Sequence, residues 1–94
     1  MNILALGSIV ILRGNAKKVM IVARSVGVKN QDEIRNFEYA GCGFPEGFNS
    51  DELIFFDSSD IGKVVFEGYK DDSSIVLEES IREWAKEKGK IKES

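Results

Sequence analysis

Histidine is absent from this chain of 94 residues, and cysteine and proline occur only once each. Without histidine there is no Ser-His or Cys-His pair for nucleophilic catalysis and no imidazole to bind a metal. The single Cys42 cannot form an intramolecular disulfide or supply the ligand set of a structural zinc site. The composition therefore disfavours the common enzyme classes and metal centres, and it favours a reducing, cytoplasmic location.

Phosphate-binding and membrane-spanning patterns are missing as well. Neither G-x-G-x-x-G nor G-x-x-x-x-G-K-[ST] occurs among the nine glycines, so nothing indicates a nucleotide. No stretch approaches the roughly 18 apolar residues of a transmembrane helix. The apolar segment from Ile3 to Leu12 lacks the preceding charge and the cleavage-site residues of a signal peptide. We therefore expect no cofactor and no membrane insertion.

Charge is distributed unevenly along the chain, whose net charge is −3. Residues 1–36 carry six basic and two acidic side chains, whereas residues 37–60 carry six acidic and no basic ones. The two signs either neutralise each other in the fold or form opposed patches that orient a partner. Phosphate binding needs a concentrated basic surface, and the isoelectric point is about 5.0. We therefore expect no nucleic-acid partner.

Five short segments have the composition of β-strands, with β-branched or aromatic residues between turn formers. They are residues 8–12, 17–23, 36–41, 53–56 and 63–69. The first two are apolar at consecutive positions, which indicates that both faces of this pair are at least partly covered. Residues 25–36 are polar and aperiodic, and we interpret them as a surface loop. The pattern predicts a mainly β, α+β fold, either a five-stranded antiparallel meander or a small SH3-like barrel.

The apolar period becomes helical near the C-terminus, which predicts one amphipathic helix at about residues 74–88. Its apolar face consists of Leu77, Ile81, Trp84 and Ala85. We expect Ser73 or Ser74 to cap the first turn. The sequence thus indicates a single domain over residues 1–89, with residues 90–94 as a charged flexible tail.

Acidic residues are the remaining candidates for chemistry. The acids between residues 46 and 60 could surround calcium, although their spacing lacks the alternation of a helix-loop-helix site. A pair involving Glu38 or Glu46 would suit a small carboxylate-dependent enzyme. Cys42 lies between two glycines, without a base to activate it, and is expected to be a small buried residue. Most acids are simply solvated, so we assign no catalytic, cofactor-binding or metal-binding residue.

Two exposed apolar features are candidates for binding another protein. Trp84 is either an anchor that packs the helix on the sheet or the centre of a partner interface. A loop that presents aromatic side chains around the single proline would form a preformed recognition tip. The candidate partner-binding residues are Phe44, Pro45, Glu46, Phe48, Ile81 and Trp84.

The same segments carry a family resemblance. The quoted matches are Leu6 to Leu12 with Lys17 to Val22, Tyr39 to Cys42 with Pro45 to Gly47, Phe55 to Ile61, and Val64 to Tyr69. Over roughly residues 4–72 the chain resembles the family called domain of unknown function 4176. The resemblance implies a short Gram-positive bacterial protein encoded beside type VII secretion genes and LXG-type toxins. It supplies no established catalytic residues.

These observations lead to a hypothesis of function with two rivals. The leading one is a non-enzymatic, cytoplasmic protein-binding accessory, such as a targeting factor or chaperone for LXG-type effectors of type VII secretion. The first rival is an immunity protein whose acidic stretch at residues 46–60 neutralises a toxin domain. The second is the small carboxylate-dependent enzyme. Self-association through an uncovered strand edge is a further expectation.

Overall fold

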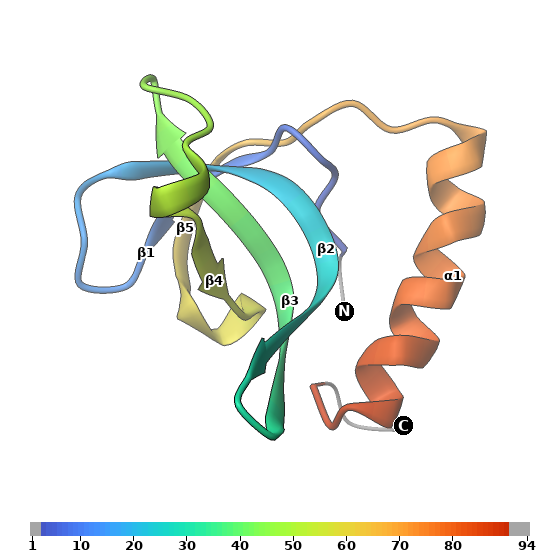
Figure 1. Cartoon of the computed structure of the whole chain (residues 1–94). Coiled ribbons are helices and arrows are strands. Elements are labelled where there is room, and N and C mark those ends of the chain that lie inside the picture. Colours follow the sequence, from blue (N-terminus) through green and yellow to red (C-terminus); the bar gives the residue numbers. More distant parts are fainter. Residues whose placement is uncertain (1–2, 91–94) are drawn as a thin grey trace.

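The computed structural model describes residues 3–90, which form one antiparallel sheet followed by a single helix (Figure 1). The strands are β1 (Ile9–Leu12), β2 (Lys18–Asn30), β3 (Glu33–Phe44), β4 (Ile54–Phe56) and β5 (Ile61–Phe66). The 3-10 turns η1 (Ser50–Glu52) and η2 (Ser58–Asp60) flank β4, and the helix is α1 (Asp72–Glu87). The predicted mainly β, α+β fold with five antiparallel strands and a C-terminal helix is confirmed.

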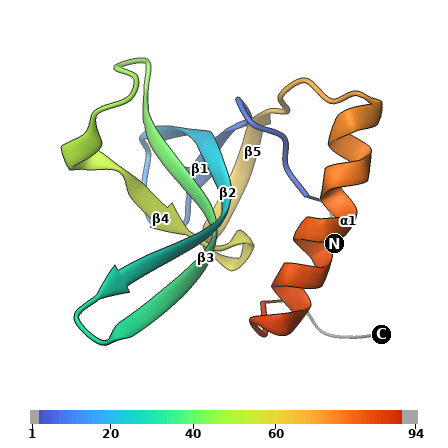
Figure 2. The same cartoon turned by 45° about the vertical axis from the view of Figure 1, so that its right-hand side comes forward.

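The strand order is β4-β3-β2-β1-β5, and every pairing is antiparallel. The first four strands form a meander, after which the chain returns to place β5 beside β1. The sheet curls strongly, but β4 and β5 remain its two edges (Figure 2). The sheet is therefore not closed, and the alternative of a complete barrel does not apply.

The interpretation of residues 25–36 as a loop is wrong, because β2 and β3 continue through them as a long hairpin. Backbone pairing extends to Lys29↔Ile34 and Asn30↔Glu33, and the turn is at Gln31, whose φ is 58°. The hairpin tip projects from the sheet into solvent, where polar side chains are stable on both faces (Figure 1). A ladder of backbone hydrogen bonds therefore holds a segment whose side chains show no strand periodicity.

The core lies on the concave side of the curled sheet. Its most buried members are Leu4, Val10, Val19, Ile21, Tyr39 and Phe56. The rings of Tyr39 and Phe56 stack with centroids 5.6 Å apart, and the Tyr39 hydroxyl accepts a hydrogen bond from Leu4 N at 3.2 Å. Cys42 is buried, as predicted, although it does not belong to this cluster. Strands meet closely at Gly41, where an added Cβ would lie 2.5 Å from Val19 Cγ1.

The two ends of α1 are fixed by polar contacts. Asp71, rather than Ser73 or Ser74, is the N-cap residue, and its carboxylate accepts a hydrogen bond from Ser74 N at 3.2 Å. A carboxylate here faces the positive end of the helix dipole, which gives it an advantage over a serine hydroxyl. At the other end, Lys90 Nζ lies 3.0 Å from Asp57 Oδ2. The rest of the predicted tail, residues 91–94, lies outside the described residues.

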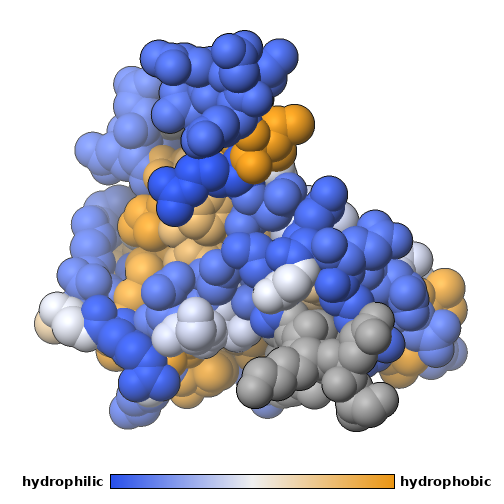
Figure 3. Space-filling model, turned by 90° about the horizontal axis from the view of Figure 1, so that it is seen from below, coloured by the Kyte–Doolittle hydropathy of each residue, from blue (hydrophilic) through white to orange (hydrophobic). Residues whose placement is uncertain are grey.

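Seen from below, the molecule has a mainly hydrophilic surface, with hydrophobic surface recessed between hydrophilic lobes (Figure 3). Within residues 3–90, no helix has both the length and the apolar character needed to cross a membrane.

Candidate functional site

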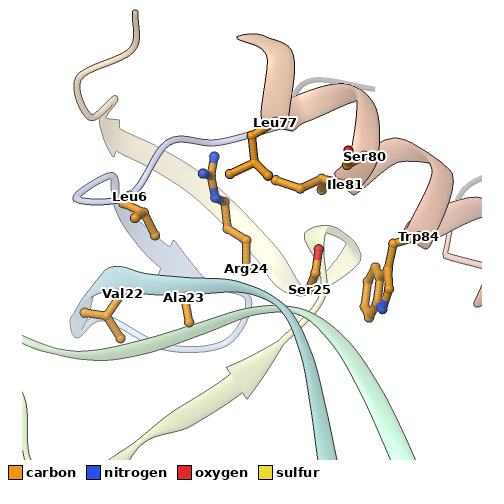
Figure 4. Close-up of a pocket in the computed structure, with 9 residues that line it drawn as sticks. All are labelled: Leu6, Val22, Ala23, Arg24, Ser25, Leu77, Ser80, Ile81 and Trp84. Atoms are coloured by element: carbon orange, nitrogen blue, oxygen red, sulfur yellow. The ribbon is translucent and has the colours of Figure 1, made fainter. Parts of the chain in front are cut away.

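An apolar groove of about 360 Å³ separates α1 from β2 (Figure 4). We call it the helix-sheet groove. The helix contributes Leu77, Ser80, Ile81 and Trp84, β2 contributes Val22, Ala23, Arg24 and Ser25, and Leu6 completes the lining. Its size falls within the usual range of ligand sites, and most of its lining is apolar. It is therefore the best-formed candidate site in the described part of the chain.

The groove lies beside the part of β2 that extends beyond its pairing with β1. β1 pairs with β2 only from Lys18 to Met20. Two further bonds join Ile21 to its neighbours, from Ile21 N to Ser8 O and from Gly7 N to Ile21 O, each 2.8 Å. The register with β3 then shifts between Ile21 and Ala23, which marks a β-bulge at Val22. Beyond it, no strand among residues 3–90 pairs with this edge of β2, and α1 stands opposite.

Arg24 places a cation beside the apolar lining, and Figure 4 shows its guanidinium rising between Leu6 and Leu77. Its one hydrogen bond to the described chain is a long one, from Nη1 to Leu4 O at 3.4 Å. It forms no ion pair with a carboxylate of residues 3–90. The guanidinium thus retains unused hydrogen-bond donors next to an apolar surface.

Glu78, a buried acid of α1, is already paired with Lys70. Lys70 Nζ lies 2.5 Å from Glu78 Oε1 and also donates to Ile3 O. The hydrogen bond from Lys70 lowers the pKa of Glu78 against the opposing effect of burial, and the charges of Lys70, Arg82 and Arg24 add to the lowering. This ion pair ties α1 to the N-terminal segment and so helps to position the helix wall of the groove.

Ser25 is unusual in two respects. It has φ 57° in the left-handed region, which is rare for a residue other than glycine, asparagine or aspartate. Its Oγ is buried and has no hydrogen-bond partner within residues 3–90, and the same holds for Glu38 Oε2, while Glu38 Oε1 accepts from Ser58 N and Oγ. The pairings on either side place Ser25 and Glu38 opposite each other on β2 and β3. Backbone strain and an unused polar atom therefore coincide at Ser25, which lines the groove, and Glu38 lies opposite it on β3.

The predicted partner-binding residues fall in two separate places. Ile81 and Trp84 are partly buried in the helix-sheet groove (Figure 4). Phe44, Pro45, Glu46 and Phe48 are exposed in the segment that begins at the last residue of β3, which lies on the other side of the molecule from α1 (Figures 1 and 2). We call this segment the Pro45 loop. The structure thus does not unite the two groups in a single surface.

The Pro45 loop is held mainly by surface contacts. The Phe44-Pro45 peptide bond is cis, and Lys18 Nζ lies 5.9 Å from the centroid of the Phe44 ring. Lys17 Nζ pairs with Glu46 Oε2 at 2.6 Å, and this hydrogen bond lowers the pKa of Glu46. Phe48 remains 66% exposed. The loop therefore presents its aromatic side chains on an exposed surface.

Several groove residues were missed by the sequence analysis, namely Leu6, Val22, Arg24 and Ser25. The consecutive apolar residues of β2 correctly indicated contacts on both faces of the strand. Nothing in that pattern indicated a bulge at Val22 or the early end of the pairing with β1. Arg24 had no distinguishing signal, because one cation at the end of an apolar segment is commonplace.

Three of the acidic residues considered for catalysis or calcium binding, Glu38, Asp57 and Asp60, belong to one hydrogen-bonded network. Asp57 Oδ1 accepts from Glu38 N at 2.9 Å, and its other oxygen contacts Lys90. Asp60 Oδ2 accepts from Asp57 N in the capping box of η2. In the part of the chain that the structure describes, no group of three or more His, Cys, Asp or Glu side chains is arranged to hold a metal ion. These carboxylates have structural roles in connecting β3, η2 and the end of α1.

No curated protein and no solved structure gives a significant match to this chain. Residues 3–77 match a family described only as a domain of unknown function. The matched range contains all five strands and the β2 side of the helix-sheet groove, whereas Ile81 and Trp84 lie beyond it. Since the match covers most of the sequence, it confirms the family that the quoted segments indicated. The chain belongs to the family domain of unknown function 4176.

Proposed function

We propose that this protein is a non-enzymatic binding module whose helix-sheet groove receives a segment of a partner protein. The observation that carries the proposal is the combination of an apolar groove, a strand edge without a paired strand, and Trp84 in one wall. Aromatic side chains that fill pockets dominate the energetics of many protein interfaces. Asp57, Asp60 and one oxygen of Glu38 are engaged in contacts that support the fold, which favours binding over catalysis.

The biological setting of this proposal comes from the family resemblance. Proteins of this kind are associated with type VII secretion genes, so the partner would be an LXG-type effector and the chain a cytoplasmic targeting factor or chaperone. Gene neighbourhood is an associational argument and not a physical one. The groove provides the physical argument, because a chaperone needs a surface that holds an unfolded or extended segment.

A second candidate function is immunity, in which this chain neutralises a toxin domain through its acidic stretch. Asp51 and Glu52 are exposed in η1, and they would face a cationic surface. Asp57 and Asp60 are less available, since both are engaged in hydrogen bonds within the fold. The observation that favours immunity is therefore confined to η1.

The test is co-expression with the toxin encoded beside the gene, followed by co-purification and an affinity measurement. We expect the wild-type chain to bind and Trp84→Ala to bind at least about tenfold more weakly, since an interface anchor contributes roughly 2 kcal/mol or more. Circular dichroism would establish that the variant is folded. Unchanged affinity in folded Trp84→Ala and Phe44→Ala variants would show that both proposed surfaces are wrong. Loss of secretion on deletion supports targeting, whereas rescue of growth supports immunity.

A further inference from the structure

We propose that the helix-sheet groove binds an extended partner segment, which adds as a strand to the edge of β2 and carries a carboxylate side chain between bulky apolar residues. This inference rests on the proposed binding function and specifies the chemistry of the partner. It goes beyond the presence of a groove, because it commits to a backbone conformation and to a charge.

The mode of binding follows from which residues line the groove. Side chains alternate between the two faces of a strand, so a groove on one face would be lined by every second residue. Here four consecutive residues of β2, from Val22 to Ser25, contribute to the lining. The bulge at Val22 and the left-handed backbone of Ser25 break the alternation, and the edge of β2 beside these residues has no paired strand within residues 3–90. Its backbone N–H and C=O groups are the natural recognition elements. A partner strand would hydrogen-bond to this edge in the space under α1.

The side chains of α1 that line the groove determine where the partner should carry apolar residues. Leu77, Ile81 and Trp84 lie on one face of α1, and Leu77 remains 49% exposed. Figure 4 shows the side chains of Leu77 and Trp84 extending from the helix toward β2. A strand placed along β2 would direct alternate side chains toward this wall. Bulky apolar residues at alternate positions, with the carboxylate at the alternate position between them, would lie on this one face and cover the surface that α1 leaves exposed.

Arg24 determines the charge that the partner should carry. Its guanidinium lies at the groove with one long hydrogen bond and without an ion-pair partner in residues 3–90. Glu78 does not serve it, because Lys70 already holds that carboxylate. Arginine binds carboxylates through paired hydrogen bonds, which become stronger beside an apolar surface. An acidic side chain on the partner is thus the complement that the groove lacks.

Ser25 supports the same location. Its left-handed backbone and unpartnered hydroxyl are both unfavourable for folding, and they occur directly after Arg24 in the groove floor. Residues held in such conformations tend to cluster at functional sites. In Figure 4 the hydroxyl points toward α1, where a partner strand would lie. The backbone strain at Ser25 therefore marks the part of β2 that lines the groove.

The probe is a phage-displayed library of random decapeptides, selected on the full chain and counter-selected on Trp84→Ala. We expect enriched sequences to contain Asp or Glu flanked by large apolar residues at alternate positions. For a synthetic peptide of this kind, we expect Arg24→Met to weaken binding roughly tenfold to a hundredfold. Lys29→Met is the matched control, because it removes one exposed positive charge from the far end of β2 and is expected to leave the affinity unchanged. Equal effects of the two substitutions would overturn the assignment to Arg24.

The conformation of the bound peptide is tested separately by hydrogen exchange and circular dichroism. We expect slower amide exchange at residues 22–26 in the complex and no gain of helical signal. We also expect Ser25→Gly to unfold at a higher temperature and to bind the peptide more weakly, which a purely structural role of Ser25 would not produce. Helical bound peptides, enrichment of basic peptides, or no enrichment would each overturn the proposal. If such results accompanied a toxin complex that depends on Trp84, the binding function would stand and the strand mode alone would fail.

Discussion

β2 takes part in two apolar regions that differ in how completely they are filled. On the concave side of the sheet, Val10, Ile21 and Tyr39 are at most 1% exposed. At the edge facing α1, Leu6 is 50% and Leu77 is 49% exposed, and a groove remains. Close packing inside is what holds a fold together, whereas exposed apolar surface in a groove marks a place for a ligand. The filled core on the concave side of β2 therefore stabilises the fold, and the open edge facing α1 is the side suited to binding.

The sharpest test of this comparison is to truncate one aromatic residue on each side. Phe56 is 2% exposed in the core, so Phe56→Ala is expected to lower the free energy of unfolding by about 3–5 kcal/mol. Trp84 is only partly buried, so Trp84→Ala is expected to cost about 1 kcal/mol. Urea denaturation of both variants measures the difference. Equal losses would mean that the groove wall belongs to the core and that the comparison fails.

The core side of β2 could be predicted from the sequence because its signals are local. β-Branched residues indicated β1, the first part of β2, and β4, and the helical period of Leu77, Ile81 and Trp84 indicated α1. Each signal reflects side chains that must be buried on one face of a single element. The number of strands and the identity of the helix therefore followed from patterns within short segments.

The groove side could not be predicted, because it depends on relations between distant segments. Residues 25–36 are strands only through backbone pairing, which leaves no periodic pattern in exposed side chains. The return of β5 to β1, and the end of β1 pairing at Met20, are properties of the whole sheet. Asp71 capping α1 in place of Ser73 or Ser74 is a smaller miss of the same kind, since several adjacent residues were chemically suitable.

A second test concerns the ion pair that positions the helix wall. The Glu78 side chain is 8% exposed and that of Lys70 29%, so Lys70→Met leaves a buried carboxylate without its partner. We expect the free energy of unfolding to fall by roughly 1–3 kcal/mol at neutral pH. The effect is moderate because the partly exposed Lys70 side chain is screened by solvent. The measurement is urea denaturation at pH 7. Lys63→Met, which removes an exposed lysine from β5, is the control and is expected to change little.

The Lys70–Glu78 ion pair also predicts the direction in which the stability of the fold changes with pH. Because the folded-state pKa of Glu78 is lowered from its ordinary value of 4.5, its stabilisation is complete above that value. It is lost as the pH falls through the lower, folded-state pKa. In Lys70→Met the principal cause of the lowering is gone, so stability should depend less on pH in this acidic range. An identical acid dependence in both proteins would contradict a role for Lys70 in holding α1.

The smallest expected effect is at the Pro45 loop, which extends the comparison from the groove to the other candidate surface. Phe48 is 66% exposed, so Phe48→Ala is expected to change the free energy of unfolding by no more than about 0.5 kcal/mol. If the groove is the binding site, partner affinity should also stay within about twofold of wild type, while Trp84→Ala loses at least about tenfold. Calorimetric titration of both folded variants with the same partner gives the two ratios. The reverse ranking would move the binding site to the Pro45 loop, because an exposed aromatic residue that contributes nothing to folding would then carry the interaction.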